Sequence, residues 1–109
     1  MPKAAHPIAK RRVRGSRTGR PIMVLLDFLG RRWALRILWE LRRGALTSRA
    51  LRAACDEASP TVLNERLKEL READFIELSD AGYALTALGR ELSEKCMPLY
   101  HFAEKWSGR

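Results

Sequence analysis

Leucines recur at helical spacing between residues 59 and 72. At about 100° per residue, one face of this segment is apolar and holds Val62, Leu63, Leu67 and Leu70. The opposite face is polar and holds Thr61, Asn64, Glu65 and Lys68. Ser59 is a favoured N-cap residue, and Pro60 suits the first helical position because no backbone donor is needed there. The pattern predicts an amphipathic helix whose polar face suits either solvent or the base edges of a DNA major groove.

Similar patterns predict four further helices, over residues 21–29, 31–43, 48–55 and 87–106. Thr47 or Ser48 is expected to cap the third helix of the chain, and Thr86 the last. Before the last helix the period changes to that of two short strands, joined through a turn with Gly82, at residues 75–78 and 83–86. The expected fold is mostly α with a small β-hairpin. Its third and fourth helices form a helix-turn-helix.

The last predicted helix carries an apolar stripe about five turns long. The stripe recurs at steps of three and four residues and consists of Leu88, Leu92, Cys96, Leu99, Ala103 and Trp106. Pro98 lies inside this helix and is expected to bend it, because proline removes one backbone donor. So small a body leaves little to cover a stripe of this length. We therefore expect the helix to pair with its copy in a second chain, as a dimerisation helix.

The chain has 109 residues and a formal net charge of +8, which is unevenly placed. Residues 1–26 contain seven Lys and Arg residues and no acid, whereas the remainder holds 14 bases and 13 acids. Residues 1–20 have few apolar positions and are expected to form a flexible basic arm before one domain at residues 21–109. A polyanionic partner explains such an arm, because each neutralised phosphate releases counterions. An uninformative tail and a transit peptide are the alternatives.

No segment has the pattern of an enzyme or of a membrane protein. The longest apolar run, residues 22–26, is too short to span a bilayer, and no secretory signal is expected. Cys55 and Cys96 indicate neither a disulfide framework nor a metal site, so the cytoplasm is the expected compartment. Cys96 is expected to pack as a small hydrophobe and Cys55 to be the more exposed thiol. Three glutamates are interleaved with Arg and Lys, as on a solvated helix surface: Glu65, Glu69 and Glu72. No cofactor is expected.

Three blocks of the sequence resemble one bacterial family. Residues 28–44 contain FLGRRW, ILWEL and a closing glycine, which resemble the LGGKW…LILREL…G opening of HxlR-type transcriptional regulators. Residues 59–70, SPTVLNERLKEL, resemble the SPKMLTERLKEL recognition helix of that family. Residues 83–92, YALTALGREL, resemble its YSLTELGREL passage from strand to helix. The blocks stand in family order, and the resemblance implies a winged helix-turn-helix protein.

The resemblance also implies a homodimer that binds a palindromic operator in double-stranded DNA and regulates transcription, here expected as a repressor. It implies a small-molecule effector, with a pocket expected near Trp33, Tyr100 and Phe102. The chain departs from the family in three places. Residues 18–21 lack the sensing cysteine of many members, residues 47–48 lack the usual RF, and the short wing carries only the negative charge of Asp80.

The candidate DNA-binding residues follow from this placement. Contacts to bases are expected from the helix over residues 59–72, through Thr61, Asn64, Glu65 and Lys68, of which the last could also hold a phosphate. Phosphate contacts are expected from the start of that helix and from nearby cations: Ser59, Pro60, Arg31, Arg32 and Arg49. The arm is expected to replace the short wing at the minor groove, through Arg11, Arg12 and Arg14. The alternative is a winged-helix module for protein–protein contact, anti-regulator or antitoxin-like, which the acidic wing and Glu65 favour.

Overall fold

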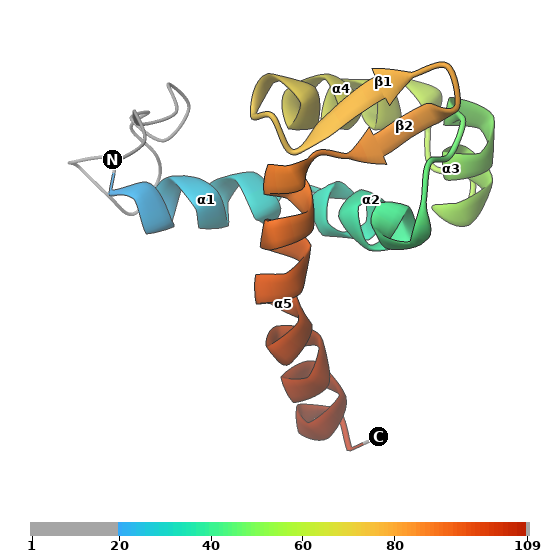
Figure 1. The fold of residues 1–109 in the computed structure, drawn as a ribbon. Coiled ribbons are helices and arrows are strands. Elements are labelled where there is room, and N and C mark those ends of the chain that lie inside the picture. The colour runs from blue at the N-terminus through green and yellow to red at the C-terminus, as the bar shows by residue number, and fades with distance from the viewer. Residues whose placement is uncertain (1–19, 109) are drawn as a thin grey trace.

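Residues 20–108 are described by the structure, which is a computed structural model. Along the chain they form α1 (Pro21–Leu29), α2 (Ala34–Glu40), the 3-10 turn η2 (Leu41–Arg43), α3 (Ser48–Ala54), α4 (Pro60–Glu72), β1 (Ile76–Ser79), β2 (Gly82–Leu85) and α5 (Ala87–Trp106). In Figure 1, α1 and α2 run across the middle, α4 and the hairpin lie above them, and α5 projects below. This arrangement confirms the predicted winged helix-turn-helix with a long C-terminal helix.

The core lies where α2, α3 and α4 meet beneath the hairpin. Its largest fully buried side chains are those of Ile37, Leu38, Leu41, Leu51, Cys55, Leu67 and Leu70. The predicted apolar face of α4 is confirmed, since its three leucines at positions 63, 67 and 70 are no more than 2% exposed. Burial of each such side chain contributes roughly 1.5–3 kcal/mol. The apolar face of α4 therefore fixes the helix on the core and leaves its polar face outside.

Helix α2 begins three residues later than the sequence predicts. Trp33 stands at its N-cap with a φ of 74°, a left-handed conformation that an α-helix does not contain. The preceding carbonyl, that of Arg32, accepts a hydrogen bond from Nε of Arg66 at 2.9 Å and so belongs to a contact with α4. The α-helix also stops early, at Glu40, and continues only as η2. The start of the predicted helix over residues 31–43 is therefore wrong, whereas its centre is correct and its last turn, in 3-10 form, ends at Arg43 as predicted.

The hairpin has a very short loop. β1 and β2 pair antiparallel with Ser79 opposite Gly82, which leaves only Asp80 and Ala81 between the strands. Gly82 has a φ of 114° and lies so close to the backbone of Leu46 that a Cβ atom would not fit. Tyr83 and Leu46 exchange both of their backbone hydrogen bonds, at 2.8 and 2.9 Å. This isolated bridge ties the loop before α3 to the wing, and the sequence pattern does not predict it.

Thr86 joins the hairpin to α5. Its Oγ1 accepts a hydrogen bond from the N–H of Gly89 at 3.0 Å, which confirms the predicted cap, and donates to the carbonyl of Asp74. Gly89 itself packs directly on the backbone of Phe75, again with no space for a Cβ. The helix continues through Pro98 as one element. Its start is thus held firmly by the body, whereas among residues 98–108 all but Tyr100 are exposed.

Candidate nucleic-acid interface

The predicted contact residues at the start of α4 and on its outer face are exposed to solvent. The exposed residues are Ser59, Pro60, Thr61, Asn64, Glu65 and Lys68. They form a continuous polar surface because they lie opposite the buried leucines of the same helix. Hydroxyl, amide and ammonium groups in this arrangement can donate to, or accept from, the edges of bases.

The first turn of α4 offers free backbone donors. Ser59 lies at the N-cap, as predicted, but its side chain makes no capping hydrogen bond. Its backbone has a φ of −51° and a ψ of 130°, and its carbonyl accepts the N–H of Leu63 at 2.9 Å. Pro60 has no N–H, whereas the N–H groups of Thr61 and Val62 precede the first intrahelical bond of the chain. An anion at this end would meet those donors and the positive end of the helix dipole.

An ion-pair network fixes the inner side of α4 to the turn between α1 and α2. Glu69 accepts Nη1 of Arg66 at 2.9 Å through Oε1 and pairs with Nη1 of Arg31 at 2.9 Å through Oε2. Arg66 also donates to the carbonyl of Arg32, and Arg31 lies 3.7 Å from Asp27 on α1. The Arg66 and Glu69 side chains are only 17% and 25% exposed, so these pairs are better shielded from solvent than ordinary surface pairs. The network holds the orientation of α4 against α1.

This network changes the roles of two predicted residues. Glu69 was expected on a solvated surface and is instead the centre of the network. Arg31 was expected to hold a DNA phosphate, but its guanidinium is already paired with Glu69 and Asp27. The spacing of Arg66 and Glu69, three residues apart on one helix, indicates that pair from sequence alone. The link to Arg31 comes from tertiary packing and has no local signal.

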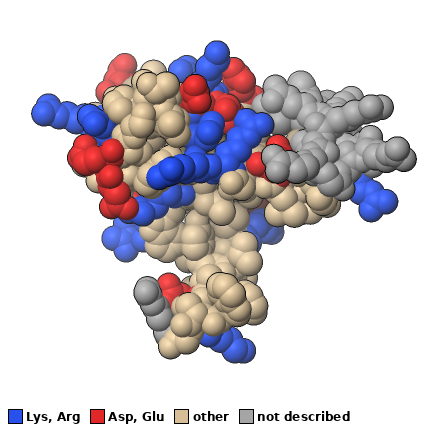
Figure 2. All heavy atoms as spheres, turned by 180° about the vertical axis from the view of Figure 1, so that it is seen from behind, with Lys and Arg blue, Asp and Glu red and all other residues tan. Residues whose placement is uncertain are grey.

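The remaining predicted cations are placed separately. Arg32 is exposed, with its guanidinium carbon 5.4 Å from the centroid of the Trp33 ring. Arg49 is exposed in the first turn of α3. On the face shown in Figure 2, Lys and Arg are interspersed with Asp and Glu over the body. The arm residues Arg11, Arg12 and Arg14 lie outside the described residues.

The turn between α3 and α4 is held by an arginine from α2. Asp56 and Glu57 in this turn have φ values of 54° and 57°, conformations that cost free energy in residues with a side chain. Arg36 donates to the carbonyl of Ala54 at 2.7 Å and pairs with Asp56 at 3.4 Å and Glu40 at 2.8 Å. The hydrogen bond with Glu40, opposed by burial, raises the pKa of Arg36 above its usual value. Arg36 therefore connects α2 to the helix-turn-helix, although its side chain is 40% exposed.

The accessibility of the two thiols follows the reverse of the expected order. Cys55 is 0% exposed and belongs to the core, so the expectation that it is the more accessible thiol is wrong. Burial raises the pKa of the Cys55 thiol, which disfavours the reactive thiolate at neutral pH. Cys96 on α5 is half-buried, and burial raises its pKa as well.

The apolar stripe of α5 is largely uncovered. Leu99 is 61% exposed and Trp106 is 80% exposed, and Leu88 and Ala103 are exposed as well. Leu92 and Cys96, nearer the body, are half-buried. The three aromatic residues expected around an effector are not brought together. Tyr100 lines a groove with α2, Trp33 lines a separate depression, and Phe102 is 59% exposed.

Residues 20–108 contain no group of three or more His, Cys, Asp or Glu side chains that could hold a metal ion. None of their helices is both long enough and apolar enough to cross a membrane.

Comparison with protein families identifies the larger part of the chain. Residues 28–109 match the family described as HxlR-like helix-turn-helix. This segment runs from the end of α1 through the helix-turn-helix, the hairpin and α5. Comparison with curated proteins and with solved structures gave no match.

Proposed function

Because the chain belongs to the HxlR-like helix-turn-helix family of DNA-binding transcription regulators, we propose that it binds a palindromic operator as a homodimer and represses transcription. The observation that carries this proposal is the outer face of α4, where Thr61, Asn64 and Lys68 are exposed on a helix fixed by three buried leucines. Repression by occupancy of the operator needs only DNA binding.

In the proposed complex α4 lies in the major groove. Asn64 and Thr61 contact base edges, because an amide can pair bidentately with adenine and a hydroxyl can donate or accept. Lys68, one turn further along, contacts a base or a phosphate. The N–H groups at the start of α4 hold a phosphate. Arg32 and Arg49 remain candidate contacts to the DNA backbone. Arg31 is paired with Glu69 and Asp27, so it contributes to DNA binding only by holding α4 in position.

The proposed dimer uses the exposed stripe of α5. Leu88, Leu99 and Trp106 on that helix have large apolar surfaces that a protomer leaves in water. Ile22 and Leu26 on α1 are 57% and 53% exposed and extend the apolar surface available to a partner. Large uncovered apolar surfaces in a small domain are typical of association sites. Two-fold symmetry would then present two α4 helices to successive major grooves.

Substitution of Asn64 tests the proposed base contact. After selection of a preferred site from random DNA, Asn64→Ala is expected to lower affinity for that site by about 1–3 kcal/mol. Its affinity for random DNA should change little, because a base contact carries the sequence information. Lys68→Ala serves as the comparison and, if it holds phosphate, weakens both complexes alike. Fluorescence anisotropy at fixed salt measures all four affinities. Equal losses on selected and random DNA for Asn64→Ala would remove Asn64 from the reading face.

Deletion of residues 1–19 tests the proposed role of the arm. The wing offers only Asp80 and Ala81 between its strands, whereas residues 1–26 hold seven bases and no acid. If the arm replaces the wing on the phosphate backbone, the truncated protein should remain folded but bind DNA much more weakly. The slope of log K against log salt should become shallower by several units, at about 0.9 per lost phosphate contact. An unchanged slope would show that the arm does not contact DNA.

A further inference from the structure

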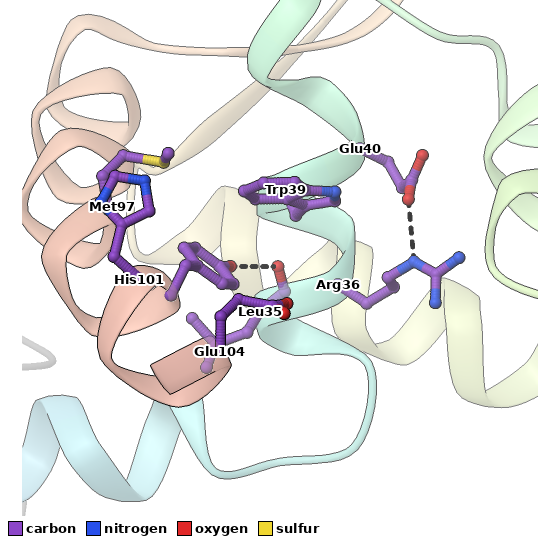
Figure 3. Close-up of a pocket in the computed structure, with 8 residues that line it drawn as sticks. Leu35, Arg36, Trp39, Glu40, Met97, His101 and Glu104 are labelled. Carbon is purple, nitrogen blue, oxygen red and sulfur yellow. Dashed lines mark hydrogen bonds and ion pairs between the residues drawn. The ribbon is translucent and has the colours of Figure 1, made fainter. Parts of the chain in front are cut away.

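A groove of about 520 Å³ lies between α2 and α5, away from the outer face of α4. We call it the α2/α5 groove. Its volume is within the range of about 300–1,000 Å³ that is usual for small-molecule sites. Trp39 and Glu40 come from α2, and Met97, Tyr100 and Glu104 from α5. Figure 3 shows Trp39, Met97 and His101 projecting into the space between the two helices.

The apolar part of the groove is aromatic and well positioned. The ring centroids of Trp39 and Tyr100 are 4.5 Å apart, with the ring planes tilted by 52°. The Tyr100 hydroxyl donates to the carbonyl of Leu35 at 3.4 Å, which ties α5 to α2 at this point (Figure 3). The guanidinium carbon of Arg42 lies 3.6 Å from the Trp39 ring centroid, so this ring already carries one cation. Both aromatic rings are half-buried and remain partly open to the groove.

The charged part of the groove is acidic. Two carboxylates line it, Glu40 and Glu104, against the single guanidinium of Arg36 and a histidine, His101. Arg36 is already paired with Glu40 and Asp56. The Glu104 side chain is exposed and, within residues 20–108, has no ion-pair partner. By the formal charges of Glu40, Glu104 and Arg36, the lining has an excess of one negative charge, while the Arg42 guanidinium lies on the Trp39 ring outside the lining.

We propose that the α2/α5 groove binds a small planar aromatic cation. The flat ring of such a ligand packs on the parts of the Trp39 and Tyr100 rings that remain open to the groove, and its positive charge lies near Glu40 and Glu104. The rings and the carboxylates favour the same ligand, because the faces of aromatic rings also attract cations. The thioether of Met97 adds a polarisable and adaptable wall. An anion of the same shape would be repelled by both glutamates.

The groove stays accessible in the proposed dimer. At about 100° per residue, the stripe that includes Leu99 and Trp106 points roughly 130° away from the groove side of α5. The groove side is formed by Met97, Tyr100 and Glu104. A partner helix on the stripe therefore leaves the groove side uncovered.

Arg36 connects the groove to the helix-turn-helix. It lines the groove and also holds the carbonyl of Ala54 and the carboxylate of Asp56, at the turn before α4. A ligand cation beside Glu40 competes with Arg36 for that carboxylate and repels the guanidinium. Since Asp56 and Glu57 keep left-handed conformations, the turn depends on the contacts that surround it. Occupancy of the groove then loosens the turn and lowers the affinity of α4 for DNA.

The effect on DNA rests on the proposed function, whereas binding to the groove does not. By linkage, DNA lowers the affinity for the ligand by the same factor. Ligand binding to the groove and loosening of the turn before α4 are therefore tested without DNA. A negative result in either test is then distinguishable from a failure of the protein to bind an operator.

Calorimetric titration of the full-length protein tests the groove with three bicyclic probes of similar shape. These are N-methylquinolinium as the cation, quinoline as the neutral ring and 1-naphthoate as the anion. N-methylquinolinium should bind about tenfold more tightly than quinoline, and 1-naphthoate more weakly still. Glu104→Gln should weaken cation binding about threefold to fivefold. Glu91→Gln, on the same helix but outside the groove, should not. Equal binding of the three probes, no binding, or equal losses in the two variants would overturn the proposed site.

Hydrogen exchange tests the connection through Arg36. With saturating N-methylquinolinium, amides of residues 55–58 should exchange several-fold faster in the wild-type protein. Arg36→Lys keeps the charge but cannot make the same three contacts, so its turn should exchange faster without ligand and respond little to it. Residues 88–92 in the first turns of α5 serve as the internal reference. Cation binding with unchanged exchange at residues 55–58 would overturn the role of Arg36.

Discussion

Leu99→Asp is expected to convert the protein from a dimer to a monomer. Leu99 is 61% exposed in the protomer, so the aspartate can be solvated there and the fold should survive. In a two-fold seam each protomer loses the burial of this leucine, roughly 1.5–3 kcal/mol, and must desolvate a charge as well. Because symmetry doubles the effect, the dimer should weaken on the order of a thousandfold or more.

Sedimentation velocity at about ten micromolar, a usual range for dimer affinities, measures this change, with circular dichroism to establish that the variant is folded. Leu78→Asp is the matched control, because Leu78 is 51% exposed but lies on β1 and not on α5. It should remain dimeric. A monomeric wild-type protein, or a Leu99→Asp variant that stays dimeric, would contradict the proposed seam.

Gly89→Ala should be among the most destabilising single substitutions in the domain. The added Cβ would overlap the backbone carbonyl of Phe75, and neither backbone can move without disturbing the Thr86 cap and the hairpin. Overpacking against side chains costs about 1–3 kcal/mol, and a contact with fixed backbone lies at the upper end or beyond. We therefore expect a loss of about 3 kcal/mol or more in the free energy of unfolding, although alanine is the better helix former.

Urea unfolding followed by circular dichroism measures the loss at one fixed protein concentration, because dimerisation makes stability depend on concentration. Ser93→Ala, one turn further along α5, is the control and should change stability by no more than about 0.5 kcal/mol. An unchanged urea midpoint for Gly89→Ala would contradict the close approach of α5 to Phe75.

Local chemistry allowed the fold to be predicted in most respects. The two faces of α4 follow from the spacing of its leucines, and the Thr47 and Thr86 caps follow from residue type at a helix start. The hairpin follows from a change of period around Gly82. In each case the interaction joins residues close in sequence, so the pattern contains the necessary information.

Features that join distant parts of the chain were missed. The Arg66 side chain donates to the carbonyl of Arg32, 34 residues away. That contact accompanies the left-handed backbone conformation of Trp33, after which α2 begins. Arg36 reaches across 18 residues to the end of α3, and only the folded arrangement shows that it holds the turn before α4. The burial of Cys55 likewise depends on how α3 and α4 pack together. For the candidate interface, the exposed face of α4 was predictable. The sequence did not show which arginines hold α4 in position and which remain available to DNA.

The most direct test of the central claim is a comparison of selected and random DNA by fluorescence anisotropy with the full-length protein. We predict that at about 0.15 M salt a site selected from a random library binds on the order of a thousandfold more tightly than random DNA. Both affinities should fall steeply with salt, because phosphate contacts release counterions. Equal affinity for the two DNAs at every salt concentration, or no binding to either, would contradict sequence-specific DNA recognition and favour a protein–protein module.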